Sequence, residues 1–480
     1  MDKSSALREL VGLLPDHLQE YILARMWPRQ QLSLSRSWRD RARSLGRSVL
    51  LGEPEGVAAH DVPAALGRIL SSRPGLTSVS YRCGACVVPL WMHGKLGSRV
   101  LDAIVSARPD LSDVRIMGAE CDSLSALDKC SSLKTLVVSL YSQPVLTDND
   151  ALRPLSRCVD LEHLEVHGCA NTVDASPLAS CTKLKHVMLW WCVVDLSVFA
   201  SCDLHHLDVY GDLLSSLEPL RGMANLRFLR ASGHTWLDDI GPLSSCTSLQ
   251  HVVLNHTAVS DLSPLAACSG LHTLELSHTP VRDLSPLAAC PCLCLRKLDL
   301  SHTPVRDLSP LAACPCLREL DLSDTDLPDL SSLADVTGLR VLDLSSWAGE
   351  AGSVSPLDLS QLAGRSLRSL DISCRAVASL APLASCPDLA ELFVFQSTYP
   401  TGHLERVRKA CRKASVHPPE DHWVSYDDAE SCLELPAAVA SAALRRRAAR
   451  RDREGQGRVR GQGRKRKHLK FACAIDVVLV

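Results

Sequence analysis

The chain has 480 residues, of which 46 % are hydrophobic and only 4 % are aromatic, and its formal net charge is −2. This length exceeds what one hydrophobic core needs, so we expect several domains or a repeat array whose core uses one aliphatic residue repeatedly. No apolar run reaches the roughly 18 residues of a membrane span, and the amino terminus lacks a signal-peptide pattern, which argues against membrane and secreted proteins.

Residues 1–50 are predicted to form a separate helical module. Apolar residues follow Pro15 at helical spacing, and a second helix reaches Trp38 among arginines. The pattern resembles the F-box, which implies a substrate receptor of a cullin-based ubiquitin ligase that docks a Skp-type adaptor. The residues that this resemblance assigns to adaptor binding are Leu14, Pro15, Leu18, Ile22, Leu23 and Trp38. The alternative for this module is a plain helical cap over the open edge of a sheet.

Residues 51–110 are predicted to be a transition with one or two longer helical repeats. Apolar residues recur at helical spacing around Ile69 and again around Ile104.

The middle of the chain is a repeat array. The stretches from Leu271, Leu295 and Leu317 share the pattern LxxLxLxxTxVxDLSPLAxC, although the third keeps it less strictly. Further copies begin at Leu111, Leu133, Leu161, Leu184, Leu204, Leu226, Leu249, Leu339, Leu367 and Leu389. A period of about 22 residues kept over so many copies predicts a solenoid over residues 111–411.

Each copy translates into one strand and one return segment. The alternation in LxxLxL predicts a short strand with inward leucines, and the proline in DLSPL favours a short 3₁₀ or extended return over a long α-helix. These repeats resemble the internalin-type leucine-rich repeats. The resemblance implies an α/β solenoid arc with a parallel sheet on its concave face and short 3₁₀ or extended segments on its convex face.

Two repeat positions depart from that family. Threonine replaces the usual asparagine at Thr257, Thr279, Thr303 and Thr325, and a threonine hydroxyl can make some of the same backbone bonds. Cysteine often replaces the last leucine, and we interpret that column as packed, reduced thiols. The lone pair Cys83 and Cys86 lacks a second pair at zinc spacing, so no metal site is expected there.

The outward strand positions of the copies from Leu161 to Leu249 collect histidines and aromatics that are rare elsewhere. Tryptophan and tyrosine are typical interface anchors, so this set is predicted to bind a protein partner on the concave face. Its members are His163, His186, Met188, Trp190, Trp191, His206, Asp208, Tyr210, Phe228 and His251. The alternative is that a loop such as residues 141–153 covers them. Without a fixed carboxylate or cysteine geometry, we expect the histidines to hold no metal.

The copies from Leu271 to Leu367 carry acidic residues at position five, counted from the first leucine, and mostly arginines at position two. We expect the arginine column to offset the repulsion between stacked carboxylates. The pattern fits a soluble charge ladder or a docking strip for a partly basic partner.

The carboxyl-terminal part changes composition. Residues 404–411 are predicted to form a helical cap, residues 412–436 a linker, and residues 437–480 a basic and disordered tail. Basic runs of this kind can act as nuclear-import signals or bind nucleic acid.

No catalytic motif is present: GxSxG, GxxxxGK[ST] and HExxH are all missing from the sequence. We therefore predict a non-enzymatic protein-interaction scaffold without a cofactor. The F-box type receptor and a nucleic-acid-associated protein are the two alternatives. The chain is expected to be intracellular, either cytoplasmic or nuclear, with its 21 cysteines mostly reduced.

Overall fold

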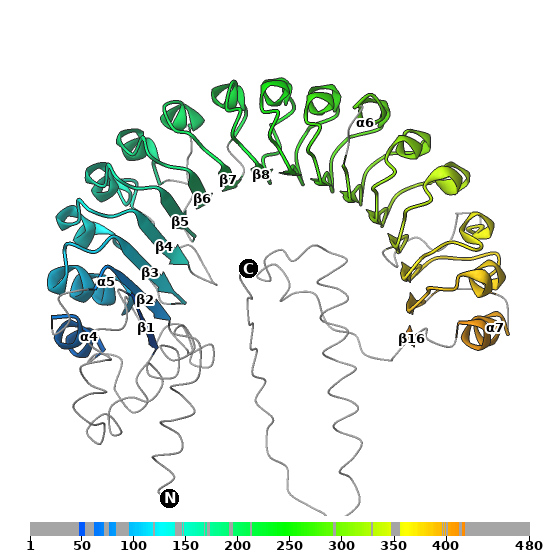
Figure 1. Cartoon of the computed structure of the whole chain (residues 1–480), viewed down its shortest axis with the longest axis horizontal. Coiled ribbons are helices and arrows are strands. Elements are labelled where there is room, and N and C mark those ends of the chain that lie inside the picture. The colour runs from blue at the N-terminus through cyan, green and yellow to red at the C-terminus, as the bar shows by residue number, and fades with distance from the viewer. Residues whose placement is uncertain are drawn as a thin grey trace, which may run out of the picture. The chain divides into compact units, whose positions relative to one another are not determined.

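The structure is a computed structural model that describes residues 48–52, 62–71, 76–82, 96–118, 121–139, 146, 148–167, 169, 173–191, 195–211, 214–290, 294–327, 330–346, 356–395, 397, 399, 402–411 and 415–417. The chain divides into two compact units, Met1–Ala258 and Val259–Val480. In each unit the strands lie on one side and the short helices on the other (Figure 1).

The first unit contains parallel strands that pair in chain order, each with the next. They are β1 (Ser48–Gly52), β2 (Ser78–Arg82), β3 (Asp113–Met117), β4 (Thr135–Ser139), β5 (His163–Val166), β6 (His186–Trp190), β7 (His206–Tyr210), β8 (Phe228–Ser232) and β9 (His251–Val253). The returning segments are α4 (Val62–Ser71), α5 (Leu96–Ala107) and 3₁₀ helices at Ser125–Lys129, Arg153–Arg157, Ser176–Ser180, Leu196–Phe199, Glu218–Leu220 and Gly241–Ser245.

The second unit repeats the same plan with shorter strands. They are β10 (Thr273–Glu275), β11 (Lys297–Asp299), β12 (Glu319–Asp321), β13 (Val341–Asp343), β14 (Ser369–Asp371), β15 (Glu391–Phe393) and β16 (Ser415–His417). The returns are α6 (Ser285–Ala288), 3₁₀ helices at Ser263–Ala267, Ser309–Ala313, Ser331–Asp335, Ser360–Leu362 and Ala381–Ser385, and the helix α7 (His403–Ala410).

The leucines of the repeat form the core of each unit. Leu133 and Leu136 in one copy, and Leu161 and Leu164 in the next, have no exposed surface. Strand register places like positions opposite one another, so Leu136 faces Leu164 across the β4–β5 pair. Because side chains alternate along a strand, the residues between these leucines face away from the core.

Each turn of the solenoid is held by short-range hydrogen bonds from polar repeat positions. The hydroxyl of Thr303 donates to the carbonyl of Leu300 at 2.5 Å, and Thr303 is 3 % exposed. The Asp307 carboxylate accepts the backbone N–H of Ser309 at 2.8 Å where a 3₁₀ helix begins. These bonds satisfy backbone groups that the turn leaves unpaired, as an Asx-type turn does.

The predicted solenoid is confirmed. The thirteen predicted strands correspond to β3 through β15. The returns between them are 3₁₀ helices or the single turn α6, and the helix α7 follows β15 at the end of the array. Strands β1, β2 and β16 extend the strand series beyond these copies. The F-box-like residues and the basic tail lie outside the described residues. No helix within the described ranges combines the length and apolar character that crossing a membrane requires.

Candidate functional site

Five rings on neighbouring strands of the first unit form a column on the outward face of the sheet. We call His163, His186, His206, Phe228 and His251 the ring column. They occupy position three of consecutive repeats, so strand register places each beside the next. Ring centroids lie 4.0, 3.9, 4.1 and 6.1 Å apart along the column, and the first three contacts are stacked. The column is therefore a continuous row of half-buried rings.

Glu165 lies beside the start of the ring column. It occupies position five of the same strand as His163, and its Oε1 lies 2.6 Å from His163 Nε2 and 3.5 Å from His186 Nε2. Burial opposes ionisation of Glu165, but the hydrogen bond from His163 and the neighbouring imidazoles hold its pKa below the usual range. Burial and the adjacent His163 lower the pKa of His186 to about 4. Within the part of the chain that the structure describes, the ligand atoms of His163, Glu165 and His186 lie close enough together to hold one metal ion.

Asp208, on the same face of β7 as His206, joins the two neighbouring strands. Trp190 Nε1 donates to Asp208 Oδ1 at 3.0 Å, and Arg230 Nη1 donates to Asp208 Oδ2 at 3.0 Å. The Arg230 guanidinium also lies 5.8 Å from the Phe228 ring centre, within cation–π range. Asp208 is only 1 % exposed, so it supports the surface and is not itself available to a partner.

Trp190 is also more buried than its outward position suggests. It is 9 % exposed because its ring stacks on His167 at 4.1 Å and contacts Tyr210 at 6.2 Å. Sequence reasoning placed Trp190 among solvent-facing anchors. The stack on His167 withdraws it from solvent, and Met188 also contacts His167, with the Sδ atom 2.7 Å from Nε2.

Trp191, by contrast, is 38 % exposed and has a positive φ of 66°. Its ring meets Tyr210 edge to face at 5.0 Å. Position eight of the repeat is left-handed in other copies too, where it holds His256, His278, His302, Asp324 and Cys374. Asparagine, aspartate and histidine tolerate this conformation better than most side chains, and a bulky tryptophan there is unusual.

Several residues of the site were not singled out from the sequence. Glu165 and Arg230 sit at position five beside predicted residues, and His167 sits at position seven, so the alternation of the strand could have identified all three. Trp236, in the turn after β8, is 76 % exposed.

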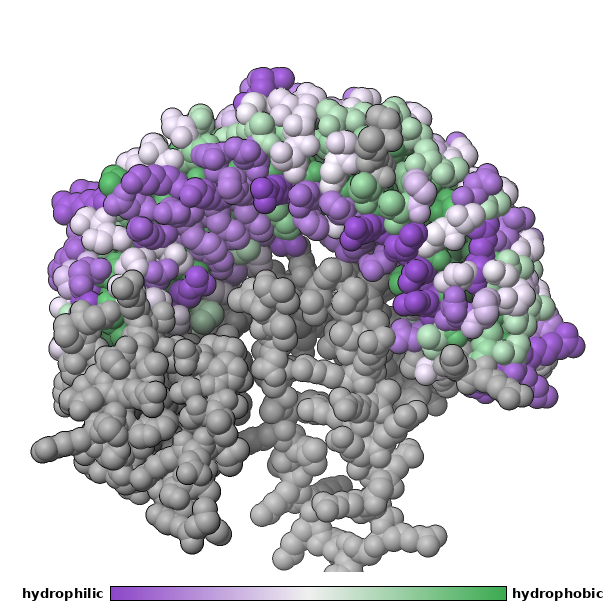
Figure 2. All heavy atoms as spheres, viewed as in Figure 1, coloured by the Kyte–Doolittle hydropathy of each residue, from purple (hydrophilic) through white to green (hydrophobic). Residues whose placement is uncertain are grey.

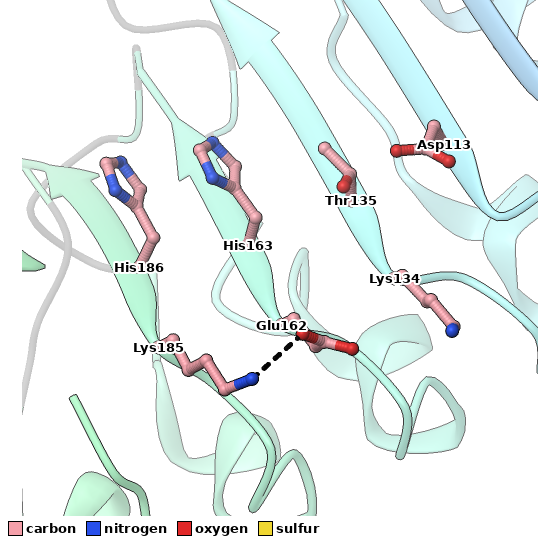
Figure 3. Close-up of a pocket in the computed structure, with 7 residues that line it drawn as sticks. All are labelled: Asp113, Lys134, Thr135, Glu162, His163, Lys185 and His186. Atoms are coloured by element: carbon pink, nitrogen blue, oxygen red, sulfur yellow. Dashed lines mark hydrogen bonds and ion pairs between the residues drawn. The ribbon is translucent and has the colours of Figure 1, made fainter. Parts of the chain in front are cut away.

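An open depression of about 350 Å³ adjoins the amino-terminal end of the ring column (Figure 3). Two lysine amines reach its rim, one of them paired with Glu162 at 3.2 Å. The residues that line it are Asp113, Lys134, Thr135, Glu162, His163, Lys185 and His186. Hydrophilic residues form a broad band over this part of the first unit (Figure 2).

The acidic column of the second unit is a separate feature. Burial and the neighbouring carboxylates Asp343 and Asp299 raise the pKa of Asp321 to about 7. Arg318 was expected to offset this repulsion. Its guanidinium instead donates to the backbone carbonyls of Pro315, Leu317 and Gly338 at 3.0–3.2 Å. The carboxylate of Asp321 accepts from the backbone and hydroxyl of Ser323.

Comparison with known proteins agrees with the repeat geometry. A family profile described as leucine-rich repeats, two copies, matches residues 295–334. An internalin from Listeria monocytogenes is 21 % identical, with a TM-score of 0.50, and the match covers 76 % of this chain and 95 % of that chain. A leucine-rich-repeat protein from Leptospira interrogans is 15 % identical, with a TM-score of 0.54, over 78 % of this chain and 90 % of that one. No curated protein sequence matches significantly. The likeness to these solved structures is one of fold: the chain folds as a leucine-rich-repeat solenoid, and its residues 295–334 match the leucine-rich-repeat profile.

Proposed function

We propose that this chain is a non-enzymatic scaffold that binds a protein partner on the ring column and on the adjoining Trp191 and Tyr210. Leucine-rich-repeat proteins typically serve as protein-interaction scaffolds, and the inward positions of the fold are occupied by packing. The observation that carries the proposal is the row of half-buried rings, together with Trp191, which directly follows β6 and is 38 % exposed.

Stacked rings are a suitable contact surface because little side-chain freedom remains to be lost on binding. His186 and His206 are held on both sides by neighbouring rings. A preorganised surface loses less entropy when a partner docks, and exposed aromatic residues are common energetic anchors. Trp191 supplies such an anchor, with its ring braced by the Tyr210 edge.

The burial of Trp190 decides which substitution tests the proposal. Replacing Trp190 would remove the hydrogen bond to Asp208 and disturb the fold. Trp191→His is the cleaner change, because His256, His278 and His302 adopt the same left-handed conformation at the same repeat position. This substitution removes the exposed indole and preserves the left-handed backbone conformation.

The experiment compares partners captured by the full chain with those captured by the Trp191→His variant, using quantitative mass spectrometry. Phe395→His is the matched control, because Phe395 in the second unit is 39 % exposed. The proposal expects Trp191→His to reduce recovery of specific partners about tenfold, the effect of roughly 1.4 kcal/mol, and Phe395→His to leave it unchanged. Equal recovery with both variants would contradict it.

The F-box-type receptor is the first alternative function. It depends on residues 1–50, and deleting them should abolish recovery of a Skp-type adaptor if the resemblance reflects function. Loss of the adaptor with retention of the other partners would assign two roles to two parts of the chain. An adaptor that never co-purifies with the intact chain removes this alternative.

A nucleic-acid-associated protein is the second alternative. It depends on the basic tail, and deleting residues 445–470 should then abolish RNA or nuclear association. An unchanged distribution would exclude it. An intracellular site of action is part of the proposal as well, and it is supported by the cysteines within the described ranges, which are thiols outside disulfides and mostly buried.

A further inference from the structure

His163, Glu165 and His186 converge at one point on the face of β5 and β6. Their ligand atoms all lie within 4.8 Å of one another. Position three and position five of a strand point to the same face, which places His163 beside Glu165. Strand register then places His186 directly opposite His163. The strand pairing thus places the carboxylate of Glu165 beside both histidines, a position that the spacing of the histidines in the sequence did not predict.

The donor set matches a particular class of ion. Two imidazole nitrogens and one carboxylate oxygen are ligands for Zn²⁺ and other divalent transition metals, whereas Ca²⁺ and Mg²⁺ take oxygen ligands. Tetrahedral Zn²⁺ with ligands at about 2.0–2.2 Å requires donors about 3.3–3.6 Å apart. His186 Nε2 and Glu165 Oε1 lie 3.5 Å apart, which meets that requirement.

His163 Nε2 and Glu165 Oε1 are closer, at 2.6 Å, because a hydrogen bond joins them. An ion would replace the shared proton and move the two atoms apart by about 1 Å. Rotation of both imidazoles, now stacked 4.0 Å apart, would turn their lone pairs toward the ion. These rotations would take His186 out of its stack between His163 and His206, whose ring centroids lie 4.0 and 3.9 Å away.

One ligand atom is without a hydrogen-bond partner. His186 Nε2 is buried and makes no hydrogen bond to any described residue. Buried ring nitrogens in proteins are normally hydrogen-bonded, so a buried nitrogen that lies 3.5 Å from a carboxylate oxygen without bonding it is a candidate metal ligand.

We propose that His163, Glu165 and His186 form a binding site for one divalent transition-metal ion of the Zn²⁺ type. Three protein ligands leave a fourth coordination position open. Two of the three ligands, His163 and His186, also line the open depression described above. The site would add a metal-dependent contact to the surface proposed above, but metal binding itself does not require that a protein binds there.

Cobalt titration of the full chain tests the site. Co²⁺ substitutes for Zn²⁺, gives visible d–d absorption at a nitrogen and oxygen site, and gives a near-ultraviolet charge-transfer band only when thiolates bind it. This distinction matters in a chain with 21 cysteines. We expect the unmodified chain to bind Co²⁺ at a site without the thiolate band and to release it to added Zn²⁺.

Two substitutions remove ligands with little disturbance. Glu165→Gln keeps the shape of the side chain, and His186→Phe keeps the stack, since Phe228 already stacks on His206 at 4.1 Å in the same column. His251→Phe is the matched control, at the same repeat position but outside the metal-binding group.

Each ligand variant should weaken the thiolate-free site about 100-fold or more, since even outer-shell changes cost 10- to 100-fold, and His251→Phe should bind as the unmodified chain does. Circular dichroism and thermal melting confirm that the variants are folded. The proposal is overturned if Glu165→Gln and His186→Phe bind cobalt normally. It is equally overturned if all cobalt binding shows the thiolate band, if the control loses the site too, or if no site exists.

Discussion

Trp190 Nε1 donates a hydrogen bond to Asp208 Oδ1 at 3.0 Å, and this bond joins β6 to β7 on the same face of the sheet as the ring column. The same carboxylate binds Arg230 from β8, so one buried anion links three neighbouring strands. Trp190 therefore supports the surface that Trp191, its chain neighbour, extends toward solvent. Two adjacent tryptophans thus have opposite roles, one structural and one exposed.

Removing this carboxylate should destabilise the first unit. Asp208→Ala leaves the Arg230 guanidinium and the Trp190 N–H without their partner in a largely buried setting, and we expect a loss of about 3 kcal/mol in the free energy of unfolding. Urea denaturation followed by tryptophan fluorescence measures it. Asp203→Ala, where the side chain is 63 % exposed, should change the free energy by less than about 0.5 kcal/mol. Equal effects of the two substitutions would refute the role of Asp208.

The threonines of position nine should each contribute one backbone bond. Thr303→Val keeps the size of the side chain but leaves the Leu300 carbonyl without the hydroxyl that donates to it. We expect a loss of about 1 kcal/mol, measured by chemical denaturation. Thr247→Val, at an exposed turn, is the control and should be nearly neutral. If Thr303→Val is as neutral as the control, the hydroxyl does not hold the turn.

Asp321 should make the second unit less stable at neutral pH than in mild acid. Its pKa is about 7 in the folded protein, whereas an unfolded aspartate titrates near about 3.9. As the pH rises from about 4 to about 7, the unfolded state ionises first, so stability falls over that window and stays low above it.

Asp321→Asn removes this dependence, because an amide oxygen can still accept the two bonds from Ser323. We expect it to stabilise the protein by at least about 1.4 kcal/mol at pH 8, from a pKa difference of more than one unit, and to have little effect at pH 4. Thermal melting of the variant and the unmodified chain at the two pH values measures this difference in stability. An effect that is the same at both values would show that the carboxylate carries no buried charge penalty.

Buried thiols of the cysteine column should resist alkylation. Burial, followed by the neighbouring thiols Cys181 and Cys130, raises the pKa of Cys158 to about 12, and its Sγ donates to the carbonyl of Cys130 at 3.1 Å. Cys294, in contrast, is exposed. Brief treatment with iodoacetamide and peptide mass spectrometry should show Cys294 modified and Cys158 unmodified until urea is added. Rapid labelling of Cys158 in the folded protein would contradict the packed-thiol interpretation.

The strands of the repeat could be predicted from the sequence because their signal is local. Leu295, Leu298 and Leu300 have no exposed surface, as the LxxLxL alternation requires. Strand β1 was missed because its segment, SVLLG, lacks that spacing, and β16 because its segment, SVH, contains no leucine. Position eight offered a signal that was overlooked: glycine and histidine recur there, and both favour or tolerate a positive φ.

The candidate site was predictable only in part, for a physical reason. Repeat register places the ring column correctly, since each ring occupies position three. The burial of Trp190 and Asp208 depends on contacts between residues 18 to 23 apart, whose partners the pattern of one repeat does not identify. Long-range polar contacts of this kind decide which side chains remain exposed.

Hydrogen–deuterium exchange of the full chain, alone and bound to a captured protein partner, tests the central claim most directly. The account predicts slower amide exchange in peptides that cover residues 186–211 and 228–232 when the partner is bound, and a loss of that protection with Trp191→His. Protection confined to the second unit, or protection unaffected by Trp191→His, would show that the ring column and Trp191 are not the binding surface.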